Sequence, residues 1–180
     1  MSEPSSSPLQ TAAALRQENV AEYLLFLWQQ EDLLRAFGMD VERLCQAMAA
    51  DEETRRWYDD LASMMAEEGV GESGHVQVHN NVLIWLSDLH ARLLRSPDEP
   101  FYSAAYYKAL PYIVELRSRS HGQAKGEIEN CMEALYGLLM LRVQGKQMRP
   151  ETQTAMDAIS RLIALLAAYY KKEQAGELKL

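Results

Sequence analysis

The chain has 180 residues, which is enough to bury one hydrophobic core but short for two independent domains. Its 26 acidic side chains outnumber the 18 basic ones and give a net charge of −8. This charge disfavours nucleic-acid binding, because basic side chains supply most of the affinity for a phosphate backbone. No run of residues approaches the roughly 18 uninterrupted apolar positions of a membrane-spanning helix, so we expect no membrane insertion.

Residues 1–11 are polar and rich in serine and proline, which predicts a disordered N-terminal tail. They lack the basic and apolar segments of a secretory signal. Cys45 and Cys131 each lie among apolar neighbours, which is typical of small buried side chains rather than of a disulfide. We therefore expect a cytoplasmic protein with one helical domain over residues 12–172 and a charged C-terminal tail over 173–180.

The first half of the chain predicts one long helix and two shorter ones. Residues 15–37 contain neither glycine nor proline, and Gly38 follows as a natural C-cap, so we expect one continuous helix. Asp40 can cap a short helix with apolar residues at helical spacing, and a third helix starts near Asp51 and ends at Gly69.

The second half continues the helical pattern, and no segment is a convincing strand. A helix is expected from near Gly74 to Arg95, although its first residues could also be extended. Further helices are expected over 101–119, over 127–144, and from Pro150 into the C-terminal tail. Pro111 should kink the first of these three. The sequence therefore predicts an all-α, single-domain bundle of about six helices.

Several segments resemble a catalogued family of helical proteins. Residues 18–23, leading into 28–35, resemble the opening helix of an uncharacterised Bacteroidetes family known as domain of unknown function 4924. Further similarities lie at Trp57-Tyr58, Gly74-His75, Asp88-Leu89-His90, Ser96-Pro97, Tyr106-Tyr107, Leu110-Pro111 and Val114-Glu115-Leu116-Arg117. The resemblance implies a single α-helical domain, and it brings no activity, cofactor or site residue with it.

His75 and His79 form an HxxxH pair, whose i, i+4 spacing places both imidazoles on one helix face, a familiar geometry for transition metals. A zinc hydrolase helix would carry a glutamate next to the first histidine, whereas this chain has Val76. Because the pair also lacks further ligands nearby in sequence, we predict neither a metal nor another cofactor.

The same histidines can belong to an anion site. Antiparallel packing of the flanking helices would bring Arg117, Arg119 and His121 near His75 and His79. Their positive charges oppose a cation and favour a phosphate or a carboxylate, helped by the N–H groups at the start of a helix. The alternative, which the sequence alone favours, is that these residues are solvated charges at the ends of helices.

Glu31 lies on the apolar side of its helix, among leucines and valines on a helical wheel. A carboxylate in that position must be paired or must have a raised pKa, and perturbed carboxylates are one mark of active sites. Arg35 follows one turn later, and Arg142 intrudes on the apolar face of its own helix. We therefore predict a buried polar cluster of Glu31, Arg35 and Arg142, with a structural ion pair favoured over a catalytic role.

Two functions of different classes follow. Amphipathic helices, many aromatic side chains and missing catalytic motifs favour a non-enzymatic binding or assembly module that self-associates or binds an unidentified protein partner. Adjacent Tyr106 and Tyr107 point about 100° apart on a helix, so one of them can line a cleft or a partner surface. The alternative is an enzyme or sensor for a small anionic ligand, bound at the His/Arg-rich end of the bundle.

Overall fold

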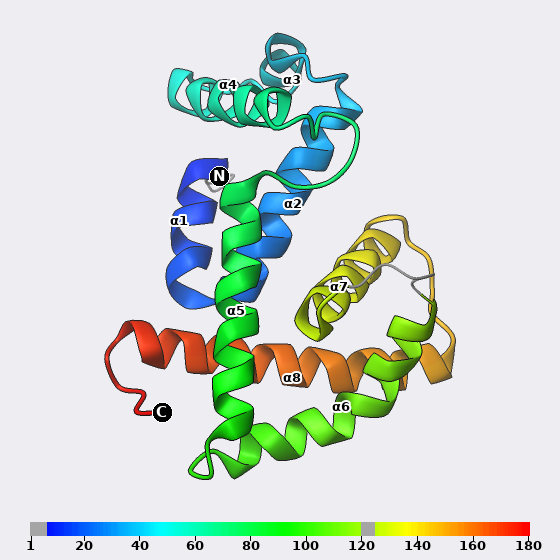
Figure 1. Cartoon of the computed structure of the whole chain (residues 1–180). Coiled ribbons are helices and arrows are strands. Elements are labelled where there is room, and N and C mark those ends of the chain that lie inside the picture. The colour runs from blue at the N-terminus through cyan, green and yellow to red at the C-terminus, as the bar shows by residue number, and fades with distance from the viewer. Residues whose placement is uncertain (1–6, 120–124) are drawn as a thin grey trace, which may run out of the picture. The chain divides into compact units, whose positions relative to one another are not determined.

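The computed structural model describes residues 7–119 and 125–180, which hold eight α-helices and no strand (Figure 1). The chain forms two compact units, which are unit 1 (Met1–Val82) and unit 2 (Leu83–Leu180). The helices are α1 (Pro8–Glu18), α2 (Val20–Ala36), α3 (Val41–Ala47), α4 (Glu52–Glu67), α5 (Gln77–Arg95), α6 (Pro100–Arg119), α7 (Glu127–Val143) and α8 (Pro150–Gln174).

The fold is all-α as predicted, but eight helices replace the expected number of about six, partly because Asn19 divides the long helix expected over 15–37. The backbone of Asn19 is extended, and the Asn19 side-chain oxygen accepts hydrogen bonds from the N–H groups of Ala21 (3.1 Å) and Glu22 (3.2 Å). Its own N–H donates to the carbonyl of Leu15 at 2.8 Å. One asparagine thus ends α1 and starts α2.

Part of the predicted N-terminal tail is helical. Ser7 and Gln10 form a capping box, in which each side chain accepts a hydrogen bond from the backbone N–H of the other. Pro8 occupies the first helical position, where a missing N–H costs nothing. These local signals start α1 inside the segment expected to be disordered, while residues 1–6 lie outside the described ranges.

In unit 1, α1 and α2 run antiparallel, and α3 and α4 pack together beyond the C-terminal end of α2 (Figure 1). Two left-handed residues, Gly38 and Met39, turn the chain between α2 and α3. The core that α2, α3 and α4 share contains Leu34, Leu44, Cys45, Tyr58, Leu61, Met65 and Val76. The first turn of α5, which belongs to this unit, is held against α2.

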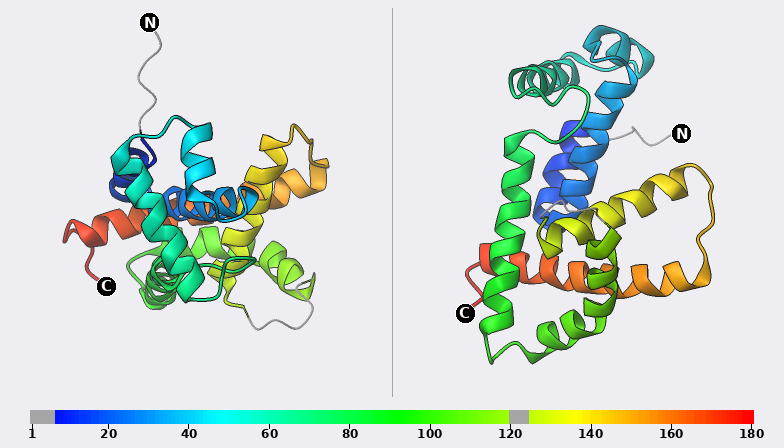
Figure 2. Two further views of the ribbon diagram at one scale, coloured as in Figure 1. Left: turned by 90° about the horizontal axis from the view of Figure 1, so that it is seen from above. Right: turned by 45° about the vertical axis from the view of Figure 1, so that its right-hand side comes forward.

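In unit 2, α6 packs on α8 and α7, and α7 also packs on α8 (Figure 2). The axis of α6 changes direction about midway along its length, and Pro111 lies inside this helix (Figure 1). Cys131, like Cys45 of unit 1, is a buried free thiol. In the part of the chain that the structure describes, no helix combines the length and apolar character needed to span a membrane.

Candidate functional site

Glu31 lies in the fourth turn of α2 and is completely buried within unit 1. One of its carboxylate oxygens accepts hydrogen bonds from the Val76 N–H (3.0 Å) and from Nδ1 of His79 (2.6 Å). The other oxygen lies 2.5 Å from Nδ1 of His75. The carboxylate thus joins α2 to the residues at the start of α5.

The partners of Glu31 keep it ionised. Burial acts to raise its pKa, but hydrogen bonds from His75, His79 and the Val76 N–H, together with the charge of His79, lower it to about 2. Both histidines turn Nδ1 toward the same carboxylate, so Glu31 engages that nitrogen of each ring. Among the residues with described positions, no cluster of three or more His, Cys, Asp or Glu could hold a metal ion.

Arg35 forms the predicted ion pair with Glu31, but its shorter contacts are with other groups. Its guanidinium is 4.0 Å from Glu31, while it donates to Asp32 at 2.7 Å and to the carbonyls of Val70 (2.9 Å) and Gly74 (2.5 Å). These hydrogen bonds from Arg35 hold the loop between α4 and α5 against α2. Arg142 is exposed in the last turn of α7 in unit 2, so it is a surface group rather than part of a buried cluster.

Neighbouring rings complete this arrangement. Trp28 stacks on the imidazole of His75, with centroids 4.3 Å apart and planes 12° apart. Tyr58 donates a buried hydrogen bond to the side-chain oxygen of Gln30 at 2.6 Å. Because Glu31 accepts hydrogen bonds from His75, Val76 and His79 of a distant segment, we interpret Glu31, His75 and His79 as a structural hydrogen-bond network of unit 1.

The predicted anion site combines residues from both units. His75 and His79 lie in unit 1, whereas Arg117 and Arg119 lie in the last turn of α6 in unit 2. Arg117 is 3.6 Å from Glu127, and Arg119 donates to Glu115. His121 lies outside the described residues. A site that joins these histidines and arginines stays a prediction.

A second polar network, which the sequence did not reveal, lies inside unit 2. Nδ1 of His90 is 2.6 Å from the hydroxyl of Tyr102, and its Nε2 is 3.5 Å from Glu127. The hydroxyl of Tyr106 donates to both oxygens of Glu127 at 3.1 and 3.2 Å. The network links α5, α6 and α7.

Burial governs the protonation of this network. It lowers the pKa of His90, which the nearby Glu127 partly offsets, and it raises the pKa of Tyr102 far above its ordinary value. Burial and the hydrogen bond to Glu127 raise the pKa of Tyr106 to about 12. Because His90 and Tyr102 are buried, their hydrogen bond joins α5 to α6 in the interior of unit 2.

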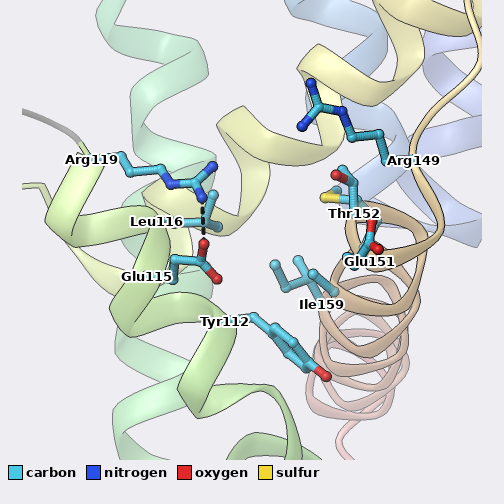
Figure 3. Close-up of a pocket in the computed structure, with 10 residues that line it drawn as sticks. Tyr112, Glu115, Leu116, Arg119, Arg149, Glu151, Thr152 and Ile159 are labelled. Atoms are coloured by element: carbon cyan, nitrogen blue, oxygen red, sulfur yellow. Dashed lines mark hydrogen bonds and ion pairs between the residues drawn. The ribbon is translucent and has the colours of Figure 1, made fainter.

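A groove of about 440 Å³ lies between α6 and α8, wholly within unit 2 (Figure 3). Leu116, Met156 and Ile159 form its apolar wall, and Tyr112 and Thr152 contribute hydroxyl groups. Arg119, from the end of α6, and Arg149, from the start of α8, stand on opposite sides of it (Figure 3). Ala155, Glu115 and Glu151 complete the lining.

The two arginines of the groove differ in their partners. Arg119 is held by Glu115, as the dashed line in Figure 3 shows. The guanidinium of Arg149 makes neither a hydrogen bond nor an ion pair with any residue whose structure is described. Arg149 is also the N-cap of α8, whose first turn has no side-chain cap. The positive end of the helix dipole adds to the positive potential at this end of the groove.

The chain matches the family described as "Domain of unknown function (DUF4924)" over residues 9–177, which includes nearly all of both units. The chain belongs to this family. The predicted family is thereby confirmed. The DUF4924 description assigns no function, and no curated protein or solved structure matches the chain significantly.

Proposed function

We propose that this DUF4924 protein is a binding module for a small amphipathic anion, held in the groove between α6 and α8. The observation that carries the proposal is the combination of an apolar wall with the guanidinium of Arg149, which has no partner among the described residues. The volume of about 440 Å³ suits a small ligand, because such sites typically enclose roughly 300–1,000 Å³.

The lining indicates the ligand's chemistry. Arg149 can form a two-point hydrogen bond with a carboxylate or a phosphate, which its planar guanidinium matches in shape. Leu116, Met156 and Ile159 offer an apolar surface to the rest of the ligand. Glu115 and Glu151 balance the charges of the two arginines, so the groove favours one anionic head group over a polyanion.

Binding is favoured over catalysis for a physical reason. A nucleophile needs a base within hydrogen-bond reach, and in the described part of the chain the lining hydroxyls of Tyr112 and Thr152 make no hydrogen bond to a carboxylate. Glu115, one of its carboxylates, is occupied by Arg119. The buried histidine and tyrosine of unit 2 bond each other instead.

Calorimetric titration with octanoate, a carboxylate on an aliphatic chain, tests the proposal. Arg149→Ala should weaken binding about ten-fold, because it removes a charged hydrogen-bond donor. Arg142→Ala is the matched control, since Arg142 is exposed in the same unit but does not line the groove. Acetate should bind much more weakly, because it lacks the apolar chain.

Equal affinity of wild type and Arg149→Ala for octanoate would contradict the proposed head-group contact. Equal affinity of the wild type for acetate and octanoate would contradict the apolar wall. Absence of any octanoate binding in the wild type would reject the assignment of an amphipathic carboxylate to the groove.

A further inference from the structure

The outer side of α6 carries an exposed apolar stripe. Tyr107 is 66% exposed and Val114 is 57% exposed, and Ala104 and Pro111 are exposed on the same side. Their spacing of three or four residues places all four on one helix face, which we call the α6 stripe. Large exposed apolar residues in a row mark an interaction surface more often than isolated ones do.

We propose that a second copy of this chain packs on the α6 stripe, with the two α6 helices antiparallel and related by a two-fold axis at Pro111. Tyr107 lies four residues before Pro111, and Val114 lies three residues after it. An antiparallel pair that crosses at Pro111 therefore sets Tyr107 of each copy against Val114 of the other. Such self-complementarity is what a two-fold interface requires.

The charges beside the stripe fit the same arrangement. Lys108 and Glu115 are both exposed and are seven residues apart, so they flank the α6 stripe on one side. Lys108 lies three residues before Pro111 and Glu115 four residues after it. The antiparallel pair brings each Lys108 near Glu115 of the other copy, where Glu115 also contacts Arg119 of its own chain.

The side chains of Ala104 and Pro111 and the dipoles of the two helices favour the same pairing. Ala104 is small, and Pro111 presents an apolar ring, so both permit close approach of two helices. Antiparallel α6 helices also place the positive end of each helix dipole near the negative end of the other. Tyr107 and Val114 do not line the groove, whereas Glu115 does, so the Tyr107 and Val114 variants test the dimer without altering the groove.

Sedimentation velocity and light scattering on the full chain, up to about 100 μM, test the proposal. The wild type should be dimeric, and Tyr107→Glu and Val114→Glu should each raise the dissociation constant at least ten-fold by burying a charge. Val143→Glu is the control, because Val143 is 71% exposed on α7, away from the α6 stripe. Circular dichroism should be the same for all variants, since each substituted residue is exposed.

A charge exchange tests the antiparallel orientation. Lys108→Glu and Glu115→Lys should each weaken the dimer, and the double variant K108E/E115K should restore it relative to Glu115→Lys alone. Glu115→Lys and the double variant both lose the contact between Glu115 and Arg119, so restoration reports a contact between copies. A monomeric wild type, a dimer unchanged by Tyr107→Glu and Val114→Glu, or absence of restoration would each overturn the proposal.

Discussion

Glu31 is ionised inside unit 1 because three donors from one distant segment converge on it. The geometry explains why a buried carboxylate need not be a catalytic acid. An active-site acid usually has a raised pKa, whereas the partners of Glu31 lower its pKa to about 2. At the residue scale, Glu31 is thus a hydrogen-bond acceptor that orders the start of α5.

Glu31→Gln should destabilise the chain by about 3 kcal/mol, because the new amide presents a donor to groups that already donate. Urea unfolding at neutral pH measures this difference. Glu22→Gln on the same helix is the control and should change stability by less than about 0.5 kcal/mol, because Glu22 is exposed. Equal stability of Glu31→Gln and the wild type would show that the hydrogen bonds of Glu31 do not stabilise unit 1.

The stability advantage of the wild type over Glu31→Gln should depend on pH. Glu31 has a pKa of about 2 in the folded chain against an ordinary value of 4.5. A lowered pKa stabilises the fold above the ordinary value, and this contribution is lost as pH falls from about 4.5 toward 2. Urea unfolding of both proteins across this range should show the gap closing, and a gap that widens as pH falls would contradict the assignment.

At the element scale, Asn19 separates two helices that apolar periodicity alone would join. Asn19→Ala should cost about 1 kcal/mol, because the N–H groups of Ala21 and Glu22 lose their acceptor. Asn19→Asp should retain most of the stability, since aspartate is an equally good cap. Thermal unfolding distinguishes the two variants, and equal melting temperatures for Asn19→Ala and the wild type would contradict the capping role.

The elements also show what the sequence could and could not predict. Helical periodicity located most helices, and the caps at Ser7 and Asn19 are local signals that were readable but were outweighed by composition and by continuous apolar spacing. The partners of Glu31 were not readable, because His75 lies 44 residues away in a loop whose path depends on tertiary packing. Arg149 was missed for a similar reason, since the groove exists only once α8 packs on α6.

At the scale of the whole molecule, one helix carries the two proposed functional surfaces. One side of α6 lines the groove through Tyr112, Leu116 and Arg119, and the α6 stripe occupies another side. The polar network of His90 and Tyr102 anchors α6 from within unit 2. We therefore expect the position of α6, which this network and its packing on α7 and α8 determine, to set the shape of both surfaces.

The central claim, that the groove between α6 and α8 binds a small amphipathic anion, is tested most directly by an amide NMR titration of the full chain with octanoate. The account predicts saturable shifts centred on Tyr112, Leu116 and Thr152, which weaken in Arg149→Ala and persist in Arg142→Ala. Shifts that are absent, that do not saturate, or that centre on residues outside the groove would contradict it.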